Sequence, residues 1–191
     1  MTASRRRAEF EALYRADADP WAMESSPYEA RKYDATLRAL RAPRHGRTLE
    51  VGCSIGVLTA LLAARSDRVV ALDVSATALS RARERPGTAN VEWMRAEVPG
   101  DWPAGRYDLI VLSEVLYFLE PVEVTSIATL VARDLARDGE AIVVNWLGEC
   151  DRTLDGDAAA ALFAQHAATQ GLRHETVARE PRYRIDRLWH P

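Results

Sequence analysis

The segment from Arg47 to Asp73 constrains the fold of this chain more than any other part of the sequence. It begins with a short strand at 48–51, passes through a turn that contains two glycines into a helix, and ends with an apolar strand at 69–72 that leads to Asp73. A strand, a glycine turn, a helix and a second strand with an acidic residue about 20 positions on form the nucleotide-binding half of a doubly wound α/β fold. The segment therefore predicts a nucleotide site at the carboxyl ends of parallel strands.

The residues of this segment have distinct physical roles. Gly52 allows a sharp turn off the strand, and Gly56 lets the start of the helix approach a ligand closely, because neither carries a Cβ. Cys53 lies between them, where a small side chain fits. Asp73 comes at the same edge of the sheet, where its carboxylate can accept hydrogen bonds from both hydroxyls of a ribose.

The glycine pattern indicates which nucleotide binds. A dinucleotide fingerprint needs glycine at positions 52, 54 and 57, where this chain has Gly52, Ser54 and Val57. A P-loop needs Gly-Lys-Ser or Gly-Lys-Thr, which the sequence lacks. Glu50, Gly52 and Gly56 instead resemble the first motif of class I S-adenosylmethionine-dependent methyltransferases, acidic-x-Gly-x-Gly-x-Gly, with Ser54 at the middle glycine.

Composition limits the class of protein. With 191 residues, of which 48% are hydrophobic and 28% charged, the chain is long enough to form one globular domain. A net charge of −3 with mixed signs predicts no nucleic-acid partner, and two cysteines predict neither a disulfide framework nor a metal site. Because the sequence shows no signal peptide and no apolar run that could span a bilayer, we expect a cytoplasmic protein without a membrane partner. The oligomeric state stays open.

The leader before the nucleotide unit predicts two helices, at 4–15 and 28–40, joined by a turn-rich connection. Segments of this kind fold over a ligand as a lid. We therefore expect a helical lid segment at 1–45 and the nucleotide-binding domain at 46–191, together forming one compact unit.

Three residues of the leader are candidates for ligand contact, each with a structural alternative. Lys32 is the only lysine of the chain. It could contact an anionic group such as the carboxylate of the cofactor, or it could be a solvated helix residue. Trp21 and Tyr28 could wall the ligand site, or they could fix the helix to the body of the protein.

The ends of the later strands supply further candidates. A short strand at 91–94 is followed by Ala96, Glu97 and Val98, at the position where a methyltransferase of this class meets the adenine ring. There a carboxylate can accept from the exocyclic amine while apolar side chains cover the ring. Glu97 could instead be surface charge; we favour the binding role.

The apolar strand at 107–112 is expected to be central and buried on both faces. It leads to Ser113 and Glu114 at the rim next to the glycine turn, where ligands of open α/β sheets bind. A helix that Gly139 ends precedes the fifth strand at 141–144. Two alternating runs follow a last helix and predict a closing antiparallel hairpin, with strands at 172–178 and 183–189.

With these positions the chain resembles the nodulation protein S family of small S-adenosylmethionine-dependent N-methyltransferases. The resemblance rests on Asp19-Pro20-Trp21, Tyr28-Glu29, Lys32-Tyr33, the run from Leu49 to Gly56, Asp73-Val74, Val98-Pro99, Asp101-Trp102-Pro103 and the run from Tyr107 to Tyr117. It implies a Rossmann-like class I methyltransferase fold: a seven-stranded, mostly parallel sheet with an antiparallel last strand, helices on both faces and an N-terminal helical lid. It also implies S-adenosyl-L-methionine as cofactor and S-adenosyl-L-homocysteine as product.

The family methylates the free amine of the terminal, deacetylated glucosamine of a chitin oligosaccharide, so the resemblance implies an amino-sugar or chitooligosaccharide acceptor. Alternatives are O- or N-methylation of another small molecule, a non-catalytic cofactor-binding module, and an NAD-dependent oxidoreductase. Glu114 is expected either to orient the acceptor amine and accept its proton or to cap the next helix, and Tyr117 to line the acceptor side. The expected cofactor contacts are Trp21, Tyr28, Lys32, Gly52, Cys53, Gly56, Asp73, Val74, Ala96, Glu97, Val98 and Ser113.

Overall fold

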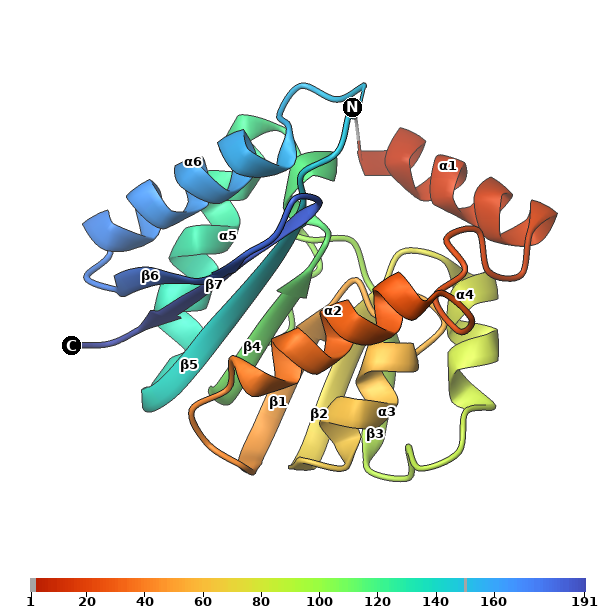
Figure 1. The fold of residues 1–191 in the computed structure, drawn as a ribbon, viewed down its shortest axis with the longest axis horizontal. Helices are drawn as coiled ribbons and strands as arrows, with labels where there is room; N and C mark the ends of the chain where they lie inside the picture. The colour runs from red at the N-terminus through yellow and green to blue at the C-terminus, as the bar shows by residue number, and fades with distance from the viewer. Residues whose placement is uncertain (1–2, 150) are drawn as a thin grey trace.

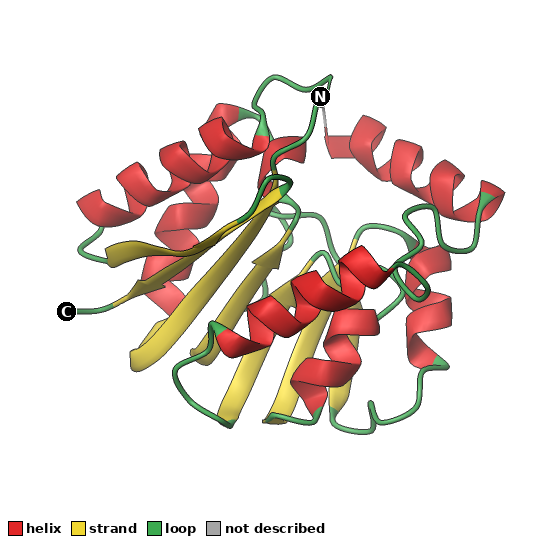
Figure 2. Cartoon of the chain, viewed as in Figure 1, coloured by secondary structure: helices red, strands yellow, loops and turns green. Residues whose placement is uncertain are grey.

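A seven-stranded sheet runs through the molecule in the order β3-β2-β1-β4-β5-β7-β6 (Figures 1 and 2). The computed structural model of the chain describes residues 3–149 and 151–191, so Cys150 lies outside the described residues. The first five strands run parallel to one another, whereas β7 runs antiparallel to both β5 and β6. The predicted sheet, with its antiparallel last strand, is therefore confirmed. The strands are β1 (His45–Val51), β2 (Ser66–Asp73), β3 (Val91–Arg95), β4 (Tyr107–Ser113), β5 (Leu135–Trp146), β6 (Arg173–Arg179) and β7 (Tyr183–Trp189).

Helices cover both faces of this sheet. The helices are α1 (Ala3–Ala16), α2 (Pro27–Arg38), α3 (Val57–Ala63), α4 (Ala76–Arg83), α5 (Pro121–Asp134) and α6 (Gly156–Thr169), with a 3-10 turn η1 at Leu116–Phe118. Leu109 and Val111 of β4 pack in a core with α2 and α3, while Ile110 and Leu112 pack in a core with α5 and α6. Alternate side chains of β4 thus point to opposite faces, which is why this strand reads as a continuous apolar run.

The local signals for helix starts are confirmed. The Ser26 hydroxyl accepts from the backbone N–H of Glu29 and precedes Pro27 at the first position of α2. Ser75 caps α4 in the same way, accepting from Ala78 N–H. Side-chain caps satisfy N–H groups that have no partner inside the helix, and proline at the first position loses no helical hydrogen bond. Helix α1 packs against α4, at the end of the sheet where the strands finish (Figure 1).

The start of β5 differs from the prediction. The strand begins at Leu135, well before the expected residue, and Gly139 lies inside it instead of ending α5. The pairing with β4 shifts between Leu135 and Glu140, so the intervening residues form an irregularity of the bulge type. A Cβ on Gly139 would lie 2.8 Å from the carbonyl oxygen of Asp108, so the glycine permits the close approach of the two strands.

Candidate active site

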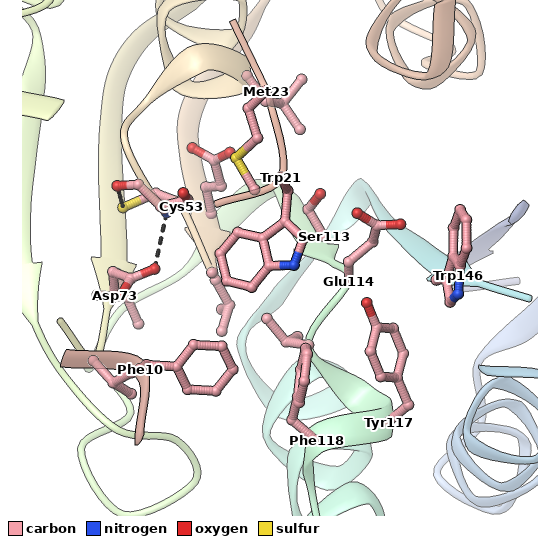
Figure 3. A pocket seen from close by; sticks show the side chains of 18 of the residues that line it. Phe10, Trp21, Met23, Cys53, Asp73, Ser113, Glu114, Tyr117, Phe118 and Trp146 are labelled. Atoms are coloured by element: carbon pink, nitrogen blue, oxygen red, sulfur yellow. Dashed lines mark hydrogen bonds between the residues drawn. The ribbon is translucent and has the colours of Figure 1, made fainter. Parts of the chain in front are cut away.

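A cavity of about 950 Å³ opens where β1, β2, β3 and β4 end, and α1, α2 and the connection between them form its other wall (Figure 3). Most of the residues that the sequence singled out line it. They are Trp21, Tyr28, Gly52, Cys53, Asp73, Val74, Ala96, Glu97, Val98, Ser113, Glu114 and Tyr117. Lys32 and Gly56 are not among the lining residues.

Asp73 is held in place by the backbone of two neighbouring segments. Its Oδ2 accepts from Ser54 N–H at 2.9 Å, and its Oδ1 accepts from Ser75 N–H at 2.8 Å. Burial raises the pKa of Asp73 to about 6, although these backbone hydrogen bonds oppose the rise. A carboxylate oxygen has room for a second donor, so both oxygens can still accept from a ligand.

The two glycines of the turn are required for different physical reasons. Gly52 has φ of +83°, and a Cβ there would overlap the Val115 side chain and lie 3.1 Å from the Ser113 carbonyl oxygen. Gly56, also left-handed, faces away from the cavity: a Cβ would meet the Trp93 ring at 2.9 Å. The prediction that Gly56 permits a close approach to the ligand is therefore corrected, because it permits packing against β3 and α4.

Glu97 lies at the cavity wall but is engaged by α1. Arg6 Nε is 3.1 Å and Arg7 Nε 3.3 Å from its carboxylate oxygens. Burial raises the pKa of Glu97, and the two guanidinium groups act against the rise. Glu97 is only 5% exposed, so it is not a free surface charge.

The opposite end of the cavity is built around Glu114. This residue follows β4 with φ of +56°, an uncommon conformation for a non-glycine residue, and its N–H donates to Val144 O at 2.8 Å. Figure 3 shows Glu114, Tyr117 and Trp146 on the side of the pocket away from Asp73. The alternative that Glu114 caps the next helix is wrong, because α5 takes Glu120 as its N-cap.

Lys32 lies behind this carboxylate. Its Nζ is 2.6 Å from Glu114 Oε2 and 2.9 Å from Glu29 Oε1, and the residue is 1% exposed. The alternative of a solvated residue is wrong, and the anionic groups that Lys32 contacts are two carboxylates of the protein itself, behind the cavity wall. The sequence could not show this, because Glu114 lies 82 residues away in the chain.

Several lining residues were missed by sequence reasoning. Glu50 lines the cavity, burial raises its pKa to about 7, and its Oε2 has no hydrogen-bond partner among the described residues. Its place in the acidic-x-Gly motif was the available signal. Phe10 and Tyr14 of α1 also line the cavity, and their rings lie 6.2 Å and 5.5 Å from that of Trp21. Trp21 projects between Asp73 and Glu114 in Figure 3.

Acidic groups outnumber basic ones in the lining. The acids are Glu9, Glu29, Glu50, Asp73, Glu97, Glu114 and Asp151, and the bases are Arg5, Arg6 and Arg152. An excess of carboxylates in a partly enclosed cavity favours positively charged ligands. The lining therefore suits a ligand that carries positive charge.

The described residues do not support thiol or metal chemistry at this site. Cys53 is buried, and desolvation raises the pKa of its thiol well above the usual value, which makes it a packing residue and not a nucleophile. Across residues 3–149 and 151–191 no group of three His, Cys, Asp or Glu side chains could hold a metal ion. Within the same residues, every helix is too short or too polar to cross a bilayer.

Comparison with known proteins places the chain among methyltransferases. The model of the nodulation protein S (NodS) family matches residues 7–160. Nodulation protein S of Bradyrhizobium diazoefficiens is 35% identical over 106 residues, which cover 54% of this chain and 51% of that protein. The protein of the same name from Sinorhizobium fredii is 35% identical over 109 residues, covering 56% and 50%. The chain therefore spans about half the length of these curated relatives.

A solved structure extends the similarity to nearly the whole fold. The N-methyltransferase NodS from Bradyrhizobium japonicum WM9, in complex with S-adenosyl-L-homocysteine, superposes with a TM-score of 0.82 over 97% of this chain and 98% of that one. The two sequences are 22% identical, so this likeness concerns the fold. It confirms the predicted class I methyltransferase architecture.

Proposed function

Because the chain belongs to the nodulation protein S family, we propose that it is an S-adenosylmethionine-dependent methyltransferase that N-methylates the free amine of an amino sugar or a deacetylated chitooligosaccharide. The observation that carries the proposal is the placement of Asp73 and Glu114 at opposite ends of one acid-rich cavity. One carboxylate is suited to a ribose and the other to an amine. An excess of acids also suits two ligands that are both cationic, a sulfonium and an ammonium.

The residues of the nucleoside end fit the cofactor. Asp73 would accept from the ribose hydroxyls, and Ala96 and Val98 would cover the adenine ring, with Glu97 toward its amine. Oε2 of Glu50, which lacks a hydrogen-bond partner in the described part of the chain, would accept from the ammonium of the methionine part. This contact would remove the cost of burying a carboxylate oxygen without a donor. When bound, the cofactor supplies a methyl carbon on a sulfonium, an electrophile that a neutral amine attacks directly.

Glu114 would prepare the acceptor. An ammonium group that reaches Glu114 gives one proton to the carboxylate, which leaves a neutral amine with a free lone pair. Burial raises the pKa of Glu114 and so favours this transfer. Tyr117, which lines the same side of the cavity as Glu114 (Figure 3), would fix the direction of the amine. Holding the two reactants in line can supply about 7 to 11 kcal/mol of the barrier in ideal cases.

The size and walls of the cavity suit a second ligand. Pockets for one ligand measure roughly 300 to 1,000 Å³, and this cavity, at about 950 Å³, lies at the upper end. Trp21 and Trp146 line it and could stack on a sugar ring. Residues 1–45 would act as the lid, since α1, α2 and their connection all contribute to the lining.

The test has a binding part and a turnover part. Calorimetry with S-adenosyl-L-homocysteine, with NADH as the competing ligand, should show binding of the first alone. A methyl-release assay against chitosan oligomers, aminoglycoside-like sugars and phenols should then show transfer to amines. Binding without any transfer would identify a cofactor-binding module, transfer to phenols would identify an O-methyltransferase, and failure to bind would exclude the enzyme.

A further inference from the structure

Three side chains at the acceptor end form a buried ionic cluster. Lys32 Nζ bridges Glu114 Oε2, 2.6 Å away, and Glu29 Oε1, 2.9 Å away. The side chains are 2%, 19% and 9% exposed for Lys32, Glu114 and Glu29 respectively. Charges as well shielded as these interact strongly, because little water screens them.

The cluster carries one more negative charge than positive, and the excess faces the cavity. Glu29 and Glu114 line the cavity whereas Lys32 does not. Glu29 Oε2 is buried and has no hydrogen-bond partner among the described residues. A cationic donor in the cavity would satisfy this oxygen and neutralise the cluster, while a hydroxyl or an anion would leave the excess charge in place.

We propose that Lys32 and Glu29 are positioning residues that make Glu114 selective for basic amines. Lys32 holds the carboxylate of Glu114 in one place and in its ionised form until an ammonium arrives. Glu29 supplies the extra negative charge that retains the ammonium. This inference rests on the proposed function, because it specifies how that site would choose nitrogen over oxygen.

The proton that the acceptor loses passes to Glu114 and then to solvent. Before the acceptor arrives, it contains one ammonium and two carboxylates. When the acceptor transfers its proton to Glu114, a neutral carboxylic acid and the Lys32–Glu29 ion pair are left beside a neutral amine. The transferred proton leaves from Glu114 to solvent after the reaction. Lys32 and Glu29 keep their charges throughout, so both act through Glu114 and not on the reacting atoms.

The groups that face Glu114 come from several elements. Helix α2 contributes Lys32, Glu29, Tyr28 and Tyr33, and Trp146 of β5 and Tyr117 of η1 line the same side of the cavity as Glu114. Burial raises the pKa of Tyr28 and Tyr33 above the usual range, so both stay neutral. Burial also raises the pKa of Glu114, and Lys32 is the cation that opposes the rise. Removal of Lys32 should therefore raise that pKa further.

The first experiment is the pH dependence of kcat/KM in two variants. In Lys32→Met the acidic limb should move upward by about 1 to 3 pH units, the size of effect that a close opposite charge has on a carboxylate. In Glu29→Gln the KM for the amine should rise about 10-fold with little change in kcat. Asp34→Asn, which removes a carboxylate from the exposed side of the same helix, is the matched control and should change neither quantity.

The second experiment needs no turnover and stands if Lys32→Met fails to fold. Because Lys32 is the only lysine, protein made with labelled lysine gives one side-chain NMR signal. Its shift should show one inflection with pH, where Glu114 takes up its proton, and Glu114→Gln should abolish that inflection. An equal loss of activity at every pH in Lys32→Met, or a lysine signal that ignores Glu114, would overturn the inference. Failure of the wild type to methylate any amine, with the lysine titration intact, would instead overturn the acceptor assignment.

Discussion

The carboxylate of Asp73 accepts a 2.9 Å hydrogen bond from the backbone N–H of Ser54, which joins the end of β2 to the glycine turn after β1. Ser54 has φ of +52°, so the turn is held in an uncommon conformation by a partner 19 residues away. The two halves of the nucleotide-binding unit are thus connected through the group that is proposed to bind the ribose. Removal of that group should affect both the turn and the ligand.

Asp73→Asn should weaken binding of S-adenosyl-L-homocysteine by about 10-fold or more. Hydrogen bonds to a charged group contribute roughly 1.5 to 3 kcal/mol, and the amide would present its N–H₂ to a backbone donor on one side. Calorimetry measures the change. Asp67→Asn, on the opposite end of the same strand and paired with Arg44 at the surface, is the control and should bind normally. Equal affinity in both variants would remove Asp73 from the site.

Glu114→Gln should lower kcat by about 10²- to 10⁴-fold, the usual size of a general-base contribution. Affinity for S-adenosyl-L-homocysteine should stay within a factor of about two, because Glu114 is assigned to the acceptor. Single-turnover rates across pH 5 to 9, with calorimetry in parallel, measure both quantities. Unchanged turnover over this range would refute the role given to Glu114.

Gly52→Ala should cost more stability than Gly87→Ala, although both glycines have φ near +80°. Each alanine carries the left-handed penalty of roughly 1 to 2 kcal/mol. A Cβ at position 87 meets nothing within 4 Å, whereas a Cβ at position 52 overlaps Val115. Urea denaturation should show an additional loss of about 1 to 3 kcal/mol at position 52. Equal losses would show that the turn can relax around the added methyl group.

The buried carboxyl of Glu50 should make the ligand-free protein less stable as pH rises. Its pKa in the folded state is about 7, above the unfolded value of 4.5, so the folded state binds the proton more tightly. The stabilisation is complete below pH 4.5 and is lost as pH passes through 7. At pH 8 the free energy of unfolding of Glu50→Gln should therefore exceed that of the wild type by roughly 3 kcal/mol, and at pH 4 the two should not differ in this way. Parallel pH curves from urea titrations would contradict this expectation.

Glu11 should control how firmly α1 is held. Its carboxylate accepts from the Ser75 and Thr77 hydroxyls and from Ala76 N–H at the start of α4. These hydrogen bonds lower its pKa to about 2, below the unfolded value of 4.5, so the anchor is present at neutral pH and is lost as pH falls from 4.5 toward 2.

Chymotrypsin should therefore cleave the Glu11→Gln variant more quickly than the wild type at Trp21, in the connection after α1. The control Arg15→Gln removes the exposed ion-pair partner of Glu11 but leaves the anchor intact. Its cleavage rate should equal that of the wild type. Equal cleavage rates for Glu11→Gln and Arg15→Gln would show that α1 does not depend on Glu11.

The sheet could be predicted because its signals are local. The central strand at 107–112 is a continuous apolar run. Ser26 and Ser75 indicate helix starts, because each caps a helix through a hydrogen bond to a residue three positions later. The start of β5 differs from the prediction because Gly139 is typical of a helix end. A glycine is needed there because the carbonyl oxygen of Asp108 on the adjacent strand leaves no room for a Cβ. A bulge depends on the partner strand and leaves no clear mark in one sequence.

Local sequence patterns were enough to predict the order of helices and strands, the glycine turn and the position of Asp73 at a strand end. Each of these follows from backbone conformation and side-chain periodicity over a few residues. The ion pairs of Lys32 with Glu114 and of Arg6 with Glu97 could be found only from the folded chain. Those ion pairs form because α1 and α2 pack against the sheet. The energy of a charged group depends on its burial and on its distance to other charges, and both are set by the packing of elements that are far apart in the sequence.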